Sequence, residues 1–152
     1  DVDTKATYQA KLEAVLKESY RLLSIGAGET DFSNVLLDSN EIAKCVPTPL
    51  ENEDDVTTTE ENARKKAIGA SVTNVSVTPD DTLEGYPDAY TYRLDGNDGI
   101  VMDVKIKVST TNGDARVKAT INMRLINGAW KVVSIDSSKD IFTELSVLDP
   151  EW

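Results

Sequence analysis

The clearest pattern in the chain is an alternation of apolar and polar residues between residues 99 and 136. A period of two places neighbouring side chains on opposite faces of a strand, so the pattern predicts strands with one buried and one solvated face. The first strand has Met102, Val104, Ile106 and Val108 on one face, and Asp103, Lys105 and Lys107 on the other. The next strand has Val117, Ala119, Ile121, Met123 and Leu125 inward, and Lys118, Thr120, Asn122 and Arg124 outward.

Two Asn-Gly pairs mark the turns after these strands, at residues 112–113 and 127–128. Asn and Gly tolerate positive φ at both central positions, which a tight type I′ hairpin requires. We therefore expect a type I′ turn at each pair. The strand after the second turn has apolar residues on both faces, with Trp130 and Val132 on one side and Val133 and Ile135 on the other. We expect other segments to cover both faces near its end.

Two weaker strands precede this pair. Residues 71–78 are rich in Val and Thr, and residues 89–94 place Tyr90, Tyr92 and Leu94 on one side. Proline and glycine break the chain between them, and residues 95–99 are predicted to form a turn. Together these segments predict a four- to five-stranded antiparallel meander, in sequence order, over about residues 70–136.

The first 69 residues carry a helical spacing of apolar positions instead of an alternating one. The period over residues 8–23 predicts a first helix, which Asp3 or Thr4 can cap at its start and which Gly26 and Gly28 end.

The same period predicts two further helices. It continues from about residue 31 to residue 46, where Pro47 stops any helix. A third helix is expected over about residues 59–68, with Thr58 and Glu61 placed as a capping box.

Helices followed by strands are typical of an α+β domain. We expect a single domain over residues 1–152, with two to three N-terminal helices packed on a curved, cone-like sheet. Its helical part is residues 1–69, its sheet part residues 70–136, and a short C-terminal helical tail follows at 137–152. The tail is predicted from four apolar residues, Ile141, Phe142, Leu145 and Leu148.

The net charge of −11 limits the classes of partner. Nucleic-acid affinity comes largely from Lys and Arg that neutralise phosphates, so a DNA or RNA partner is disfavoured, as is an anionic membrane surface. No apolar run approaches the ~20 residues of a membrane span, so we expect no membrane insertion within this segment. Because the chain starts at Asp1 without Met, we expect a processed chain or a fragment, with any signal peptide or anchor upstream.

The chain contains no histidine and a single cysteine, Cys45. This composition excludes Ser-His-Asp and Cys-His catalysis, His-ligated zinc and structural zinc. We interpret Cys45 as a buried structural thiol. No Gly-rich phosphate loop occurs, and we expect no cofactor, no metal and no catalytic residue.

Carboxylates are the remaining candidate ligands. Residues 51–55 form an acidic run that could hold a hard cation, although a solvated loop between two helices is the interpretation that we favour. Residues 95–98 begin like a calcium loop, but Ile106 stands where its last ligand should be, so we expect a turn. Asn74 fits a glycosylation acceptor within a predicted strand.

The aromatic residues are the last candidates. They could line a pocket between the sheet and the helices, although ordinary core packing is the interpretation that we favour. The predicted cavity-lining residues are Tyr8, Tyr20, Tyr90, Tyr92 and Trp130.

Residues 127–135, Asn-Gly-Ala-Trp-Lys-Val-Val-Ser-Ile, carry a recognisable signature. With helices before the meander, this segment resembles the cystatin-like or nuclear-transport-factor-2-like superfamily, in which many small bacterial envelope proteins end a strand on Gly-x-Trp-Lys-Val/Ile. The chain departs from the superfamily between its second and third helices, where a Pro- and acid-rich stretch, 47–57, replaces an early hairpin. The cystatin-like variant therefore fits as well.

The superfamily includes isomerase-like and dehydratase-like enzymes, ligand-binding domains and non-catalytic assembly modules. Its enzymes use acids, Tyr or His inside the cone, and no predicted strand here places an acid inward. The resemblance therefore implies a shape and no activity.

The hypothesis that we favour is a non-catalytic extracytoplasmic domain that binds a protein partner or serves in envelope assembly. It would be bacterial, in the cell envelope or secreted, as the soluble part of a lipoprotein or membrane-anchored protein. The alternatives are a small-molecule binder or cofactor-free isomerase using the cone, and a calcium-dependent module using residues 51–55. A homodimer through the sheet face stays open.

Overall fold

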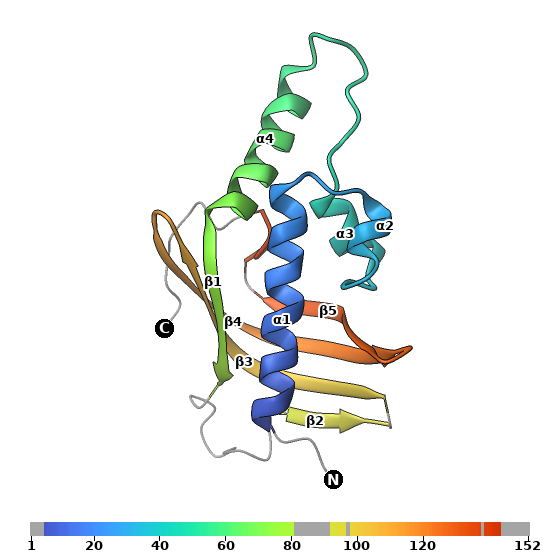
Figure 1. Cartoon of the computed structure of the whole chain (residues 1–152), viewed down its shortest axis with the longest axis vertical. Helices are drawn as coiled ribbons and strands as arrows, with labels where there is room; N and C mark the ends of the chain where they lie inside the picture. The colour runs from blue at the N-terminus through green and yellow to red at the C-terminus, as the bar shows by residue number, and fades with distance from the viewer. Residues whose placement is uncertain (1–4, 81–91, 97, 138, 144–152) are drawn as a thin grey trace.

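The computed structural model describes residues 5–80, 92–96, 98–137 and 139–143 (Figure 1). Helix α1 lies across one face of a five-stranded antiparallel sheet, and α4 projects beyond the sheet (Figure 1). This arrangement confirms the predicted α+β class. The elements are α1 Lys5–Ser24, α2 Glu29–Phe32, α3 Ser39–Cys45, α4 Val56–Ser71, β1 Val72–Pro79, β2 Tyr92–Asp95, β3 Gly99–Thr110, β4 Gly113–Ile126 and β5 Ala129–Ser137.

Helix α1 is the first predicted helix. Its apolar residues at helical spacing, including Leu12, Leu16 and Leu23, are fully buried against the sheet. The helix ends as expected at Gly26, which has φ 66°, and the next N–H group, that of Ala27, bonds back to the helix. The predicted caps at residues 3 and 4 lie outside the described residues.

The second predicted helix is wrong as a continuous element. The chain forms α2, then leaves the helical path so that Leu36 makes a parallel bridge to Val132 of β5, and then forms α3. Helix α3 restarts because the Asp38 carboxylate accepts a bond of 2.9 Å from the N–H of Asn40. The long-range bridge thus outweighs the local helical period.

The third predicted helix exists as α4, but its N-cap differs from the prediction. The Asp55 carboxylate caps the helix by accepting bonds from the N–H group of Thr58, at 3.1 Å, and from its hydroxyl, at 2.7 Å. Thr58 therefore lies inside the first turn, so the predicted capping box with Glu61 is wrong. Helix α4 also begins earlier than predicted, at Val56, and runs directly into β1.

The strand order is β1-β3-β4-β5, with β2 paired to β3 as well. Strands β3, β4 and β5 form the predicted meander. Strands β1 and β2, however, pair with successive stretches of the same edge of β3, so the expected order of five sequential neighbours is wrong at this point. Strand β1 pairs with β3 between residues 104 and 110, and β2 pairs with β3 between residues 99 and 102.

The two hairpin turns differ. Asn127 and Gly128 have φ values of 52° and 83°, as the predicted type I′ turn requires. The first turn does not have this form. Thr110 pairs with Gly113, and neither loop residue, Thr111 or Asn112, has the positive φ that a type I′ turn requires. Asn127 is the only non-glycine residue with positive φ in the described part of the chain.

A β-bulge in β5 overturns one predicted side-chain orientation. Val132 pairs with Met123 and Ser134 pairs with Asn122, so Val133 is the extra residue. The bulge places Ile135 opposite the fully buried Ile121 and packs it against the core. Ile135 therefore faces the core like Val132, whereas the alternation predicted the opposite face.

Of the three edge strands, β1 and β5 have edge backbone groups that are already bonded, and β2 pairs only with β3. On β1, the N–H of Val77 donates to the Glu13 carboxylate of α1 at 2.8 Å. On β5, the carbonyl of Val132 accepts from the N–H of Leu37, and its N–H donates to the carbonyl of Val35, each at 2.8 Å. These contacts protect the edges from pairing with other chains.

Gly69 is the closest approach between α4 and α1. A Cβ atom there would lie 2.5 Å from the Ser24 nitrogen and 2.6 Å from the Tyr20 carbonyl oxygen, both of which are backbone atoms that cannot move aside. The two helices can therefore cross at this distance only because residue 69 has no side chain.

We expect Gly69→Ala to destabilise the fold by about 1–3 kcal/mol, the usual cost of overpacking. This cost exceeds the gain of up to ~1 kcal/mol from replacing Gly by Ala in a helix. Urea unfolding followed by circular dichroism measures the change.

Gly28→Ala is the matched control, because its added Cβ meets nothing within 4 Å and its φ of −86° suits any residue. An equal or greater stability of the Gly69 variant would contradict the close-packing account.

Candidate functional site

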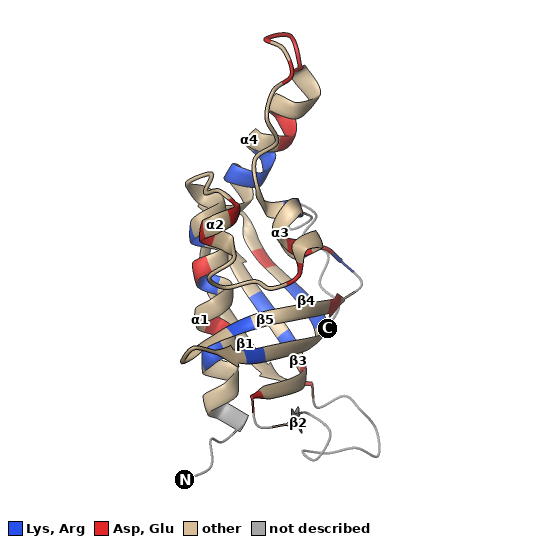
Figure 2. Cartoon of the chain, turned by 90° about the vertical axis from the view of Figure 1, so that its right-hand side faces the viewer, with Lys and Arg blue, Asp and Glu red and all other residues tan. Residues whose placement is uncertain are grey.

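Six basic side chains lie together on the face of the sheet that points away from α1. Between the buried inward residues of β3 and β4, the outward positions are half-buried. Figure 2 shows Lys and Arg gathered on these strands. We call this set the outer basic cluster, and its members are Lys105 and Lys107 of β3, Arg116, Lys118 and Arg124 of β4, and Lys131 of β5.

The sheet register pairs these residues with one another. Lys105 lies directly opposite Lys118, Lys107 opposite Arg116, and Arg124 opposite Lys131. Like charges directly opposite on neighbouring strands are destabilising, by roughly 0.2–1 kcal/mol for each pair. The register therefore concentrates positive charge on this face.

The cluster has two ends along β4. Six residues separate Lys118 from Arg124, about 20 Å at the rise of an extended strand. Thr120 and Asn122 lie between them on the same face. The carbonyl oxygen of the Asn122 side chain is buried without a hydrogen-bond partner in the described part of the structure.

Acidic groups balance part of this charge. The Lys107 ammonium lies 3.5 Å from the Asp114 carboxylate, and the Lys131 ammonium donates to the Ser33 carbonyl at 3.1 Å. The Asp103 carboxylate accepts a bond of 2.8 Å from the Thr120 hydroxyl, which confirms its predicted outward direction. The outward positions of β3, β4 and β5 nevertheless carry twice as many basic as acidic residues, in a chain of net charge −11.

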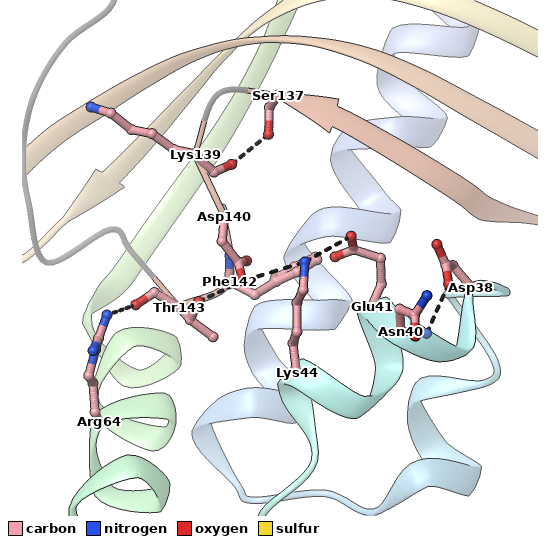
Figure 3. Close-up of polar contacts among 10 residues, drawn as sticks. All are labelled: Asp38, Asn40, Glu41, Lys44, Arg64, Ser137, Lys139, Asp140, Phe142 and Thr143. Atoms are coloured by element: carbon pink, nitrogen blue, oxygen red, sulfur yellow. Dashed lines mark hydrogen bonds and ion pairs between the residues drawn. The ribbon is translucent and has the colours of Figure 1, made fainter.

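A second polar region surrounds the chain after β5. Residues 139–143, here called the strap, place Ile141 and Phe142 in the core, with at most 1% of each side chain exposed. The Tyr20 hydroxyl donates to the Ile141 carbonyl at 2.7 Å, and its ring packs against Phe142. Arg64 of α4 donates to the Thr143 carbonyl (Figure 3). The strap therefore closes the core between α3 and α4.

A cleft of about 140 Å³ opens beside the strap, where Glu41, Lys44 and Asp140 meet. The Lys44 ammonium lies 3.4 Å from the Glu41 carboxylate and 3.8 Å from that of Asp140 (Figure 3). Burial raises the pKa of Glu41 above its usual range, and the attraction of Lys44 only partly offsets this rise. Only 14% of the Glu41 side chain is exposed.

The structure describes three of the five aromatic side chains that we predicted to line a cavity. Tyr8 and Trp130 pack edge to face, with ring centroids 5.7 Å apart. Tyr20 lies twelve residues further along α1, about 18 Å away at the helical rise, against the strap. Tyr90 lies outside the described residues, as does the side chain of Tyr92. A cavity lined by these five residues stays a prediction.

Burial confirms the interpretation of Cys45 as a buried thiol. Only 2% of this residue is exposed, and burial, followed by the nearby charge of Asp140, raises the pKa of the thiol to about 12. A thiol that stays protonated at neutral pH is a poor nucleophile.

Two features are absent from the described residues. No group of three or more Cys, Asp or Glu side chains is arranged to hold a metal ion. No described helix is both long enough and apolar enough to cross a bilayer.

The outer basic cluster was partly visible in the sequence, because the alternation already placed Lys105, Lys107, Lys118 and Arg124 outward. What sequence reasoning missed was that β3 and β4 pair these residues across the strands. The short turn after β3 could have revealed this pairing, since a two-residue loop determines which residues of the two strands face each other.

Comparisons with known proteins returned two solved structures. A calcium/calmodulin dependent protein kinase II association domain from Xanthomonas campestris has 16% identity and a TM-score of 0.39, covering 89% of this chain and 87% of its own. A nuclear transport factor 2-like superfamily protein from Salmonella enterica serovar Typhimurium has 12% identity and the same TM-score, covering 89% and 92%. At such low scores we derive nothing from these likenesses. No protein-family model and no curated protein matches the chain.

The raised pKa of Glu41 makes the free energy of unfolding depend on pH. A carboxyl group whose pKa is raised by folding contributes stability below its unfolded pKa of about 4.3, and this contribution is lost as pH rises through the raised value. We expect Glu41→Gln to gain stability relative to the wild type as pH increases from about 4 to 7. Urea unfolding of both proteins across this range measures the difference. A difference that moves the other way would mean that attraction to Lys44 outweighs burial.

Tyr20 generates a prediction about the strap. We expect Tyr20→Phe to lose about 0.5–1.5 kcal/mol of unfolding free energy, because the ring stays packed while the bond to the Ile141 carbonyl is lost. Hydrogen exchange of the strap amides should increase together with this loss. Unchanged stability and unchanged exchange would show that the hydroxyl does not hold the strap.

Proposed function

We propose that this chain is a non-catalytic, extracytoplasmic domain that binds a protein partner through the outer basic cluster. The observation that carries the proposal is the alignment of Lys105 with Lys118, Lys107 with Arg116 and Arg124 with Lys131. A concentration of one sign of charge on one face is typical of surfaces that recognise a partner of opposite charge.

The remaining surfaces of the sheet support this choice of face. Its inner face is filled by the core, and its edge strands are bonded at Val77 by α1 and at Val132 by residues 35–37. A partner that adds a strand at Val77 or Val132 would have to displace these contacts.

The charge of the chain supports a protein partner over a nucleic acid. The net charge of −11 repels a long polyanion, which extends well beyond the cluster. An acidic patch on a folded protein is small enough to meet only the outer basic cluster. Electrostatic complementarity of this kind raises association rates and excludes wrong partners.

The non-catalytic part of the proposal draws on the groups that could do chemistry. The chain has no histidine, and the Cys45 thiol is buried with its raised pKa. The Asp103 carboxylate faces outward and is bonded to Thr120.

The extracytoplasmic part draws on the resemblance of residues 127–135 to bacterial envelope proteins. Fractionation of cells that express the natural full-length protein tests it, and recovery of the protein only with the cytoplasm would refute this part.

The binding face is tested by reversing the charges of Lys105 and Lys118 to Glu. We expect at least about a tenfold loss of partner cross-linked and retained from cells of the source organism, since this corresponds to only about 1.4 kcal/mol of binding free energy. The double variant keeps a like-charge pair at the same positions, so folding should change little.

The matched control reverses Lys11 and Lys17, which are exposed on α1, and changes the net charge equally. Equal loss of the partner in both variants would show that net charge, and not this face, governs binding.

A further inference from the structure

An acidic projection lies at the end of α4, away from the sheet. Residues 50–56, here called the acidic tip, contain the four carboxylates of Glu51, Glu53, Asp54 and Asp55. Figures 1 and 2 show that the loop before α4 projects beyond the body of the molecule, with its acidic residues at the extreme end. Two large apolar side chains flank the acidic run and are exposed, Leu50 to 51% and Val56 to 64%.

Local contacts hold the acidic tip in place. The Asn62 side chain accepts from the N–H of Thr48 at 2.8 Å and donates to its carbonyl at 2.9 Å, which clamps the entry to the loop. Asp55 caps α4 at the exit. The Asn52 side chain accepts from the N–H of Asp54 at 2.9 Å within the loop. The carboxylates are therefore presented on an anchored projection.

We propose that the acidic tip of one copy of this chain docks on the outer basic cluster of a second copy. This inference rests on the proposed function and names the protein partner as the chain itself. The charges are complementary, because the tip carries four carboxylates and the cluster six basic side chains.

The apolar residues fit the same pairing. Val101 lies on the outer face opposite Asn122, between the two basic ends, and is half-buried. It gives Leu50 or Val56 of the incoming copy an apolar contact at the centre of the cluster. Exposed apolar side chains beside complementary charges are typical of a protein contact surface.

The contact joins two different surfaces. The acidic tip and the sheet lie at separate parts of one molecule, so a tip meets the cluster of another copy and not its own (Figure 2). Two copies that exchange tips form a closed dimer, whereas docking in one direction produces a ring or an open chain of copies. In an open chain, one terminal copy keeps its tip unused and the other keeps its cluster unused.

The net charge of −11 opposes association, and ionic strength determines how strongly. At about 0.1 M salt the Debye length is about 10 Å, so a docked tip responds to the cluster beneath it more than to distant acidic residues. At about 1 M salt the Debye length falls to about 3 Å, and the attraction between the tip and the cluster is screened as well. Association should therefore be measurable at moderate salt and weak at high salt.

Sedimentation velocity over a concentration series tests the proposal. We expect reversible growth in weight-average mass at about 0.1 M NaCl, and an apparent Kd at least about tenfold weaker at about 1 M NaCl, where screening is strong. A single monomer at all concentrations in moderate salt would overturn the proposal.

Two charge-reversal variants identify the surfaces. Lys105→Glu with Lys118→Glu makes the face acidic, and Glu51→Lys with Glu53→Lys makes the tip basic while leaving the Asp55 cap in place. Each variant alone should stay monomeric. Mixing the two should restore association, because the basic tip of one then meets the acidic face of the other. Circular dichroism verifies that both variants fold.

The outcomes separate this proposal from the proposed function. Association that persists in the tip variant, or that mixing does not restore, overturns tip docking. If the wild type stays monomeric while a different cross-linked partner is lost only in the face variant, self-association fails and the binding face stands. If the face variant retains both self-association and every cross-linked partner, both proposals fail.

Discussion

The register between β3 and β4 is the constraint on which the rest of the structure depends. It places Val104 and Ile106 opposite apolar partners over the core, and the same pairing sets Lys105 opposite Lys118 on the other face. A slip by one residue would move every side chain to the opposite face, which would bury the lysines and expose the core. The apolar face therefore enforces the like-charge pairs, and their repulsion is a small cost against the burial of a whole strand face, at about 0.8 kcal/mol per buried CH₂.

Burial of apolar side chains also determines the path of the chain at the end of the sheet. The bulge at Val133 restores Ile135 to the core side, and the strap then carries Phe142 under α3 and α4. The strap needs hydrogen bonds to side chains, because a short irregular segment has no ladder of backbone hydrogen bonds of its own. The Asp140 carboxylate supplies one by accepting from the Phe142 N–H at 3.0 Å, and Lys44 lies between it and Glu41. The small polar cleft is thus explained by closure of the core.

Local sequence patterns predicted those elements whose side chains alone decide their conformation. The alternation in β3 and β4 and the helical period of α1 each extend over many residues, so both were predicted correctly. The segment around Leu36 was not, because its apolar spacing satisfies a helix and also a bridge to Val132, and only the distant strand decides between them. The bulge at Val133 was missed because it depends on pairing with β4. The outer basic cluster needed the register across the first turn, which the individual strand patterns do not contain.

Charge segregation is the remaining consequence of this fold. A strand with one buried face must solvate the other, and either sign of charge would satisfy that requirement. Here the outward positions of β3, β4 and β5 carry twice as many basic as acidic residues, whereas the loop before α4 concentrates carboxylates in a chain that is acidic overall. Solubility alone is served by net charge and does not require the two signs to be separated. Separation does produce two complementary surfaces held at fixed positions by the same core, and a rigid molecule with opposite charges at different places associates in a defined orientation.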